Sequence, residues 1–181
     1  MIKKLFIALI GFFLIVVLYF IYALIINPKS PKGEASIIEK DLELNVSYSR
    51  PYKKNRLIFG EKKDNALVPH NEYWRLGANF ATELSLNKSI LFSGKNLNPG
   101  NYRMYVIPNS DSWEVVLNSE AGSFGFNPPD KKNDILSVIV SVQETNESLE
   151  QFTIDFNKDT LGINLIMSWD KTRVLVPIKP N

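Results

Sequence analysis

The stretch LGINLIMSW, residues 161–169, decides the fold class of this chain. Apolar side chains occupy every second position of it, at Leu161, Ile163, Leu165, Met167 and Trp169. Successive side chains of a β-strand point to opposite faces, so a period of two is typical of a strand with one buried face. The stretch therefore predicts a β-strand that packs one face against a core.

The same alternation recurs along most of the chain. It covers residues 42–48, 102–106, 113–117 and 152–156, while the runs 135–142 and 173–178 are more apolar and predict central strands. No convincing amphipathic helix follows residue 36, and turn-forming residues separate the runs at spacings of about ten residues. We predict an all-β fold, an antiparallel β-sandwich. A closed β-barrel is the alternative, because periodicity does not count sheets.

The N-terminal segment has a different character. Residues 5–26, LFIALIGFFLIVVLYFIYALII, are 22 residues without a charge. As a helix they would extend about 33 Å, which is enough to cross a bilayer core of roughly 30 Å. The run predicts a transmembrane helix that acts as an uncleaved signal anchor. A cleaved signal peptide is the weaker alternative, because its apolar region would span about 7–15 residues before a small-residue cleavage site.

Charges around this segment predict its orientation. Lys3 and Lys4 precede it, whereas Lys29 and Lys32 follow it with Glu34 close by. The positive-inside rule favours a cytoplasmic N-terminus by a narrow margin. We expect a single-pass membrane protein with an extracytoplasmic C-terminal domain. The predicted organisation is an anchor over residues 1–26, a linker over 27–35 and a β domain over 36–181.

Composition excludes several functional classes. Removing Lys3 and Lys4 from the 21 Lys and Arg residues leaves 19, which equals the 19 Asp and Glu residues. The charges are interspersed, so no nucleic-acid partner is predicted, and the run PYKKNR (51–56) is interpreted as a solvated strand end. One histidine and no cysteine argue against a zinc site. We predict no metal and no cofactor.

Polar residues gather in YWRLGANFATEL, residues 73–84. In a structural interpretation, Arg75 and Glu83 form a partly buried ion pair, and two neighbouring side chains bond backbone groups at the bend. In a functional interpretation, arginines clamp an anionic group while Glu83 accepts a proton or a hydroxyl. The candidate binding residues are Arg50, Arg75, Asn79, Thr82 and Glu83.

Two functions from different classes fit this inventory. The first is a membrane-tethered binding or interaction module for an envelope glycan, peptide or protein. The alternative is a small hydrolase with Glu83 and Asp155 as an acid–base pair, since glycosidases place two carboxylates about 5–10 Å apart.

Longer stretches carry a family resemblance. VSYSRPYKKNRLIFG (46–60), LVPHNEYWRLGANFATEL (67–84), GKNLNPGNYRMYVIPNSDSWEVVLN (94–118), EQFTIDF (150–156) and SWDKTRVLVPI (168–178) resemble the DUF2911 family. The resemblance covers nearly the whole predicted domain and implies a compact all-β fold, often exported or membrane-anchored in bacteria. The family label itself records an unknown function.

Two departures from the family pattern stand out. Many sequences that resemble the family have an acid at the position of Phe80. The loop GEKKDNALVPH (60–70) is also longer than the family resemblance leads us to expect.

Overall fold

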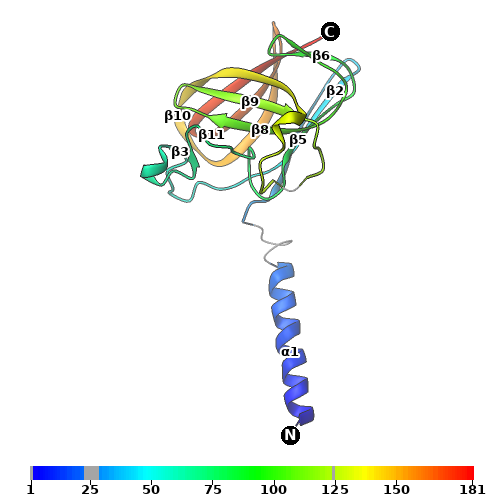
Figure 1. Cartoon of the computed structure of the whole chain (residues 1–181), viewed down its shortest axis with the longest axis vertical. Coiled ribbons are helices and arrows are strands. Elements are labelled where there is room, and N and C mark those ends of the chain that lie inside the picture. The colour runs from blue at the N-terminus through cyan, green and yellow to red at the C-terminus, as the bar shows by residue number, and fades with distance from the viewer. Residues whose placement is uncertain (1, 23–28, 124) are drawn as a thin grey trace.

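The computed structural model describes residues 2–22, 29–123 and 125–181. One α-helix precedes a β domain that also contains two short 3₁₀ helices (Figure 1). In chain order the elements are α1 (Ile2–Ile21), β1 (Lys32–Glu39), β2 (Leu42–Ser49), β3 (Phe59–Gly60), η2 (Lys62–Asp64), β4 (Val68–Pro69), β5 (Thr82–Leu86), β6 (Ile90–Phe92), β7 (Lys95–Leu97), β8 (Gly100–Pro108), β9 (Ser112–Asn118), η3 (Lys131–Asn133), β10 (Asp134–Asp159) and β11 (Gly162–Pro180).

The expected N-terminal helix forms as α1, whose sequence is mostly apolar. Large apolar side chains such as Phe12, Phe13 and Ile15 are exposed along it. Among the described residues, however, no helix combines the length and the apolarity that a membrane crossing requires. Residues 23–26, the last part of the predicted span, lie outside the described residues.

The predicted antiparallel all-β fold is confirmed. One nine-stranded sheet has the order β1-β2-β5-β8-β9-β10-β11-β6-β7, and β3 pairs with β4 in a separate two-stranded parallel sheet. The residues 161–169 that predicted a strand lie mainly in β11, where Ile163, Leu165, Met167 and Trp169 are buried. Leu161 departs from the prediction. It is 75% exposed, because it lies in the turn between β10 and β11.

The domain begins earlier than predicted. β1 starts at Lys32, so residues 32–35 of the predicted linker are strand. Lys32 pairs with Ser49 and Ala35 with Val46 in the antiparallel β1–β2 ladder. The Pro- and Lys-rich composition that indicated a linker is overridden by this pairing, which depends on residues outside the stretch itself.

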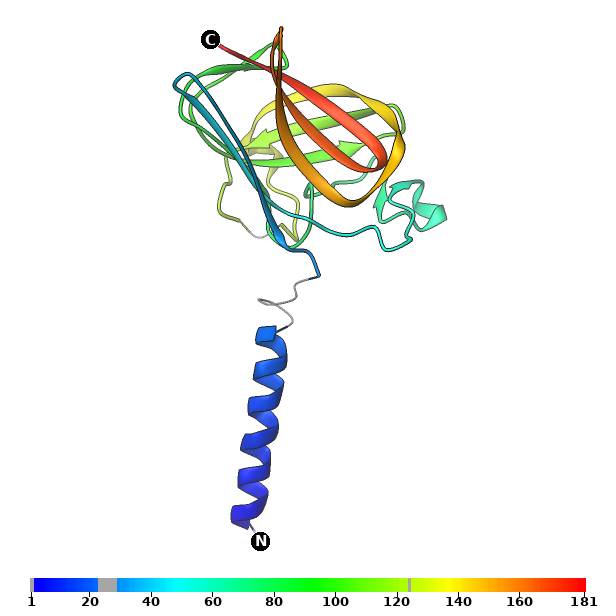
Figure 2. The same cartoon turned by 180° about the vertical axis from the view of Figure 1, so that it is seen from behind.

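Strand β10 connects the two halves of the sheet. Its first part, residues 134–141, pairs with β9, and residues 142–159 pair with β11. Two register shifts, between Glu144 and Thr153, mark where its pairing with β11 is irregular. The runs 135–142 and 152–156, expected as separate strands, are thus one strand. Figure 2 shows β10 and β11 crossing in front of the other strands.

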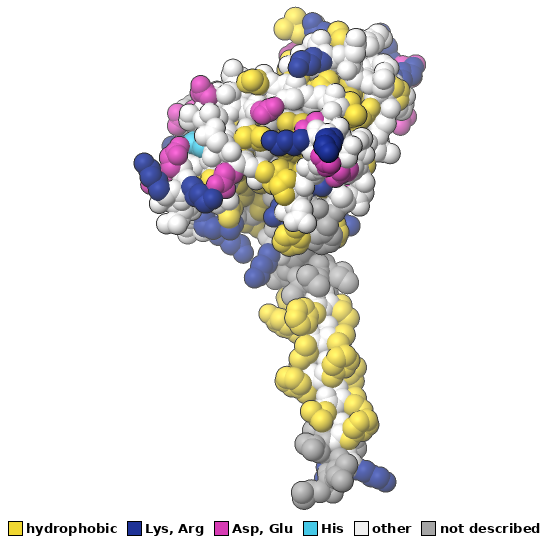
Figure 3. Space-filling view, in the orientation of Figure 1, with side chains coloured by type: hydrophobic (Ala, Val, Ile, Leu, Met, Phe, Trp, Pro, Cys, Tyr) yellow, Lys and Arg dark blue, Asp and Glu magenta, His cyan; other side chains and the backbone are white. Residues whose placement is uncertain are grey.

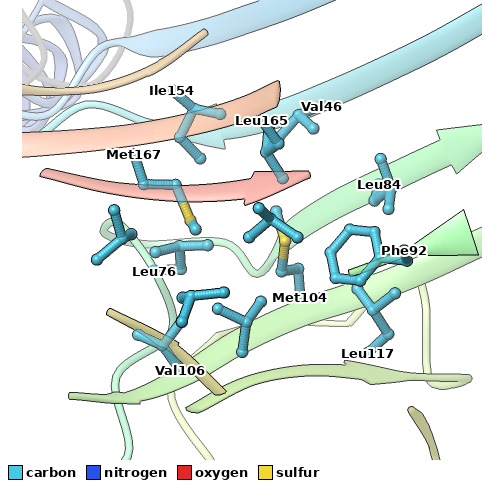
Figure 4. Packing of buried hydrophobic residues seen from close by; sticks show 14 of the residues in the cluster. Val46, Leu76, Leu84, Phe92, Met104, Val106, Leu117, Ile154, Leu165 and Met167 are labelled. Atoms are coloured by element: carbon cyan, nitrogen blue, oxygen red, sulfur yellow. The ribbon is translucent and has the colours of Figure 1, made fainter. Parts of the chain in front are cut away.

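The alternative of a closed barrel is wrong, since the strand order of the described residues has two ends, β1 and β7. The bent sheet instead folds over a single apolar core. Figure 4 shows Val46, Leu84 and Met104 from the first half of the sheet near Ile154 and Leu165 from the second half. Each of these side chains is at most 2% exposed.

Aromatic rings fill the end of the core next to β3. The Trp74 ring lies 5.5 Å from Trp113, 5.0 Å from Phe152 and 5.9 Å from Trp169, between ring centres. Phe59 contacts Trp113 at 5.1 Å. These rings form the aromatic cluster: Phe59, Trp74, Trp113, Phe152 and Trp169. The cluster holds the loop that starts at Trp74 against the core.

Candidate functional site

The loop of residues 75–81 is fixed at both ends. Trp74 exchanges two backbone hydrogen bonds with Val106, at 2.9 and 3.0 Å, and its Nε1 donates to the Gly77 carbonyl at 3.1 Å. Thr82 Oγ1 donates to the Leu76 carbonyl at 2.6 Å. The loop between these anchors is therefore held by side chains of the core and of β5.

The backbone inside this loop has an uncommon conformation. Leu76 and Asn79 have φ of 56° and 58°, in the left-handed region. Gly77 has φ of 142°, and a Cβ there would lie 2.6 Å from the Ser49 carbonyl oxygen. Only glycine fits this position, because side-chain-bearing residues rarely adopt that φ and the Ser49 backbone leaves no room.

Arg75 is oriented by two neighbours. Its Nη1 donates to the Asn79 carbonyl at 3.4 Å, and its guanidinium lies over the Phe126 ring, 4.8 Å from the ring centre. Gly125 makes this approach possible, since a Cβ on it would lie 2.9 Å from Arg75 Cδ. A guanidinium positioned in this way keeps donors available for an anion.

A second loop faces this one. Lys54 and Asn55 both have positive φ, 49° and 57°, and Arg56 N–H donates to the Lys53 carbonyl at 3.1 Å to close the turn. The Arg56 guanidinium donates to the carbonyls of Lys53 and Tyr52. Backbone pairing with β10 fixes the loop in place: Lys53 N–H donates to the Glu150 carbonyl and Phe152 N–H to the Pro51 carbonyl.

The two loops enclose a cavity of about 600 Å³, here called the basic cavity. Its cationic lining residues are Lys29, Lys54, Arg56 and Arg75. Its aromatic lining residues are Tyr52, Trp74 and Trp169, and residues 77–79 contribute backbone. Among the described residues, no Asp or Glu lines it. The cavity therefore combines positive charge with apolar walls.

Backbone donors add to this charge. The backbone N–H groups of residues 75–79 donate no hydrogen bond to any described residue, although Leu76 and Gly77 are buried. Successive N–H groups around left-handed residues form concave sites for anions. Strained backbone also tends to cluster at functional sites, and both loops of the basic cavity contain such residues.

An ion pair joins the second loop to β11. Lys53 Nζ lies 2.6 Å from Asp170 Oδ1, and Ser148 Oγ donates to the same oxygen at 2.6 Å. Burial by itself would raise the pKa of Asp170. The hydrogen bonds from Lys53 and Ser148 outweigh that effect and lower the pKa below its ordinary value.

We expect Asp170→Asn to lower the free energy of unfolding by about 1.5–3 kcal/mol at pH 7, because hydrogen bonds to a charged group contribute that much. A carboxylate with a lowered folded pKa stabilises above its unfolded pKa of about 3.9. The difference from wild type should therefore be full at pH 6–7 and disappear as the pH falls through the folded pKa. Urea denaturation across this pH range measures it.

The matched control for this prediction is Asp155→Asn, on the exposed part of β10. It should change stability by less than about 0.5 kcal/mol, as surface substitutions usually do. A difference between wild type and Asp170→Asn that persists undiminished at pH 2 would contradict the ionic explanation.

The residues predicted as one site are divided by the structure. Arg75 and Asn79 line the basic cavity. Arg50 lies against β10, where its Nη2 donates to Thr153 Oγ1 at 3.2 Å. Thr82 is fully buried under the loop. Glu83 lines a smaller cavity of about 240 Å³.

The expected ion pair between Arg75 and Glu83 does not form within the described chain. Arg75 bonds the Asn79 carbonyl, while Glu83 Oε1 accepts a hydrogen bond from Gly122 N–H. The two side chains leave the sheet at different places: Arg75 belongs to the loop before β5, and Glu83 to the outer face of β5 beside Ser47 of β2. Asp155 is exposed on β10, and no described cavity is lined by both Glu83 and Asp155.

Sequence reasoning missed two groups of residues. Lys54 and Arg56 belong to the run interpreted as a solvated strand end. Asn55 between them is the signal for a turn, since asparagine tolerates the left-handed conformation that it adopts here. Arg103 was not singled out. It is 3% exposed on β8 and donates to Ser123 Oγ at 2.8 Å, to Tyr73 Oη at 2.7 Å and to the Asn127 carbonyl. Arg103 alternates with Tyr102 and Met104, so the sequence predicts that its side chain lies on the opposite face of the strand. In the structure, the chain after β9 covers that face through Ser123 and Asn127.

These features define a small antiparallel β domain whose cavity is basic and aromatic. The chain belongs to the family described as "Protein of unknown function (DUF2911)", which it matches over residues 30–178. The resemblance seen in the sequence is thus confirmed. No curated protein and no solved structure matches the chain.

Proposed function

We propose that the β domain is a binding module, and that the basic cavity takes an anionic ligand with an apolar or aromatic part. The observation that carries this proposal is the lining, in which four cations surround aromatic side chains and, among the described residues, no carboxylate is present. A volume of about 600 Å³ falls within the range typical of small-molecule sites.

Each part of the lining has a chemical role in this proposal. Arg75 binds a carboxylate or phosphate through two parallel N–H donors, and Lys54 adds a point charge on the facing loop. The backbone N–H groups of residues 77–79 supply neutral donors. Trp74 and Tyr52 contact the apolar part of the ligand, whose burial provides the non-directional share of the affinity.

We further propose that the module is tethered to a membrane through residues 5–26, with its N-terminus in the cytoplasm and the β domain outside it. This rests on the uncharged run of 22 residues and on the position of Lys3 and Lys4 before it. The ligand is then a component of the cell envelope, such as an acidic glycan, peptide or protein group.

Titration of the full chain in detergent with phenyl phosphate tests the cavity, with quenching of Trp74 and Trp169 fluorescence as the readout. We expect Arg75→Gln to weaken binding about tenfold or more, since a charge-assisted hydrogen bond contributes about 1.5–3 kcal/mol. Lys131→Gln on η3, away from the cavity lining, is the control and should bind like wild type. Phenol should not bind, because it lacks the charge.

Two results would contradict the proposal. One is equal affinity of wild type and Arg75→Gln for phenyl phosphate. The other is the absence of binding to phenyl phosphate, benzoate and inorganic phosphate alike, with circular dichroism showing a folded protein.

A further inference from the structure

Three exposed apolar residues either line the basic cavity or contact a residue that lines it. Leu57 is 48% exposed, Leu67 is 41% exposed and Phe126 is 66% exposed. Leu67 lines the cavity and its N–H donates to the Leu57 carbonyl at 3.0 Å. Phe126 lies under Arg75. These three residues are called the apolar rim.

The cations beside the rim have no carboxylate on their charged groups, although Glu150 Oε1 accepts a hydrogen bond from the backbone N–H of Lys54 at 2.9 Å in the described chain. Within the described part of the chain, Lys29, Lys54, Arg56 and Arg75 form no ion pair. Figure 3 shows basic and apolar side chains together at the end of the β domain nearest α1. A surface that presents large apolar side chains among cations without ion pairs is chemically complementary to the interface of an anionic membrane.

The surface also lies close to the predicted membrane segment. Lys29 and Ser30 line the basic cavity, and Lys29 follows Ile26, the end of the predicted membrane segment, by three residues. Three residues extend at most about 10 Å. The part of the cavity lining that Lys29 forms therefore lies close to whatever surface surrounds residues 5–26.

We infer that the apolar rim and the cations around the basic cavity seat on an anionic membrane surface, and that the cavity takes the phosphate of a lipid headgroup. This inference rests on the proposed anion-binding function and names its ligand class. The rim side chains enter the interfacial region, and the cations face the lipid phosphates. Lys54 and Arg75 bind one phosphate inside the cavity, against Tyr52 and Trp74.

The absence of cysteine from the sequence allows a direct test. Leu67→Cys in the full chain is labelled with an NBD fluorophore, and the chain is placed in nanodiscs of neutral phosphatidylcholine or of phosphatidylcholine with phosphatidylglycerol. Leu57→Cys is a second rim position in case labelling at residue 67 disturbs the cavity. Asn96→Cys on β7 is the control, because β7 pairs with β6 at the end of the domain away from α1 (Figure 1).

We expect NBD emission from the rim positions to rise and shift to the blue in the anionic discs and to change little in the neutral ones. Emission from residue 96 should be the same in both. Lys29→Gln and Lys54→Gln should each reduce the docked fraction, lowering the docked-to-undocked ratio about fivefold, which corresponds to about 1 kcal/mol per basic residue near an anionic surface. Lys131→Gln should not change it, and 0.5 M salt should weaken docking.

Equal rim emission in neutral and anionic discs would overturn the inference. Glycerol phosphate distinguishes this failure from that of the proposed function. If it binds the full chain in detergent while the discs have no effect, the cavity takes a free anionic compound, so the proposed function stands and the membrane inference is wrong. If glycerol phosphate, phenyl phosphate, benzoate and inorganic phosphate all fail to bind and the discs have no effect, both are wrong.

Discussion

Trp113→Ala should lower the free energy of unfolding by about 3–5 kcal/mol, the range seen when a large aromatic side chain is removed from a packed core. Trp113 on β9 is fully buried, and its ring contacts Phe59 at 5.1 Å and Trp74 at 5.5 Å. The substitution leaves a cavity where the aromatic cluster meets the sheet. Chemical denaturation of the full chain in detergent, followed by circular dichroism, measures the change.

Trp113→Phe separates packing from hydrogen bonding. The Trp113 Nε1 is buried and has no hydrogen-bond partner in the described chain. Removing an unsatisfied donor recovers part of the loss, because a buried unpaired polar group costs about 1–3 kcal/mol. We expect Trp113→Phe to cost less than half as much as Trp113→Ala. The control is Ile139→Ala, at a residue 75% exposed on β10, and a Trp113→Ala effect no larger than the control's would contradict the packing argument.

Arg103→Ala is the second substitution with a large expected effect. We expect it to lower the free energy of unfolding by about 3 kcal/mol, since hydrogen bonds that involve a charged group contribute about 1.5–3 kcal/mol each and are not additive. The Arg103 guanidinium joins β8 to Tyr73 and to the chain after β9 through Ser123 and Asn127. Its loss leaves these three acceptors without their donor.

The expected structural consequence is confined to the outer layer. Amides of residues 119–123 and 125–130 should exchange hydrogen faster in Arg103→Ala, while amides of β11 should keep their protection. Arg103→Lys is the matched variant: it keeps the charge, but one ammonium group cannot reproduce the planar donors that reach three acceptors. It should show most of the loss. A variant Arg103→Ala as stable as wild type would show that the guanidinium does not hold this layer.

The strands were predictable because their signal is local. Alternation along residues 161–169 depends only on the two-residue repeat of an extended backbone, and four of the five apolar residues in the alternating row are buried as expected. The fifth, Leu161, shows the limit of the signal. The end of a strand is set by its pairing with the neighbouring strand. The apolar period does not contain that information, so it does not show that Leu161 lies in the turn rather than in β11.

The candidate site was predictable only in part. Two of the candidate binding residues, Arg75 and Asn79, line the basic cavity, because the polar run around the Gly-Ala pair forms a tight bend beside it. Glu83 was grouped with Arg75 by sequence distance, yet it bonds Gly122, a residue of the chain after β9. Proximity in sequence does not specify which face of a sheet, or which loop, a side chain meets.

By itself, the amino-acid sequence determined the all-β class, the family and the apolar N-terminal helix, because each depends on residue order over short range. The tertiary structure decided which cations share a cavity. Lys54 and Arg75 come together because residues 51–53 pair with residues 150–152 of β10 while Trp74 pairs with Val106 of β8. Such convergence depends on the pairing of distant strands, and that pairing is selected by burial of the whole core rather than by any local pattern.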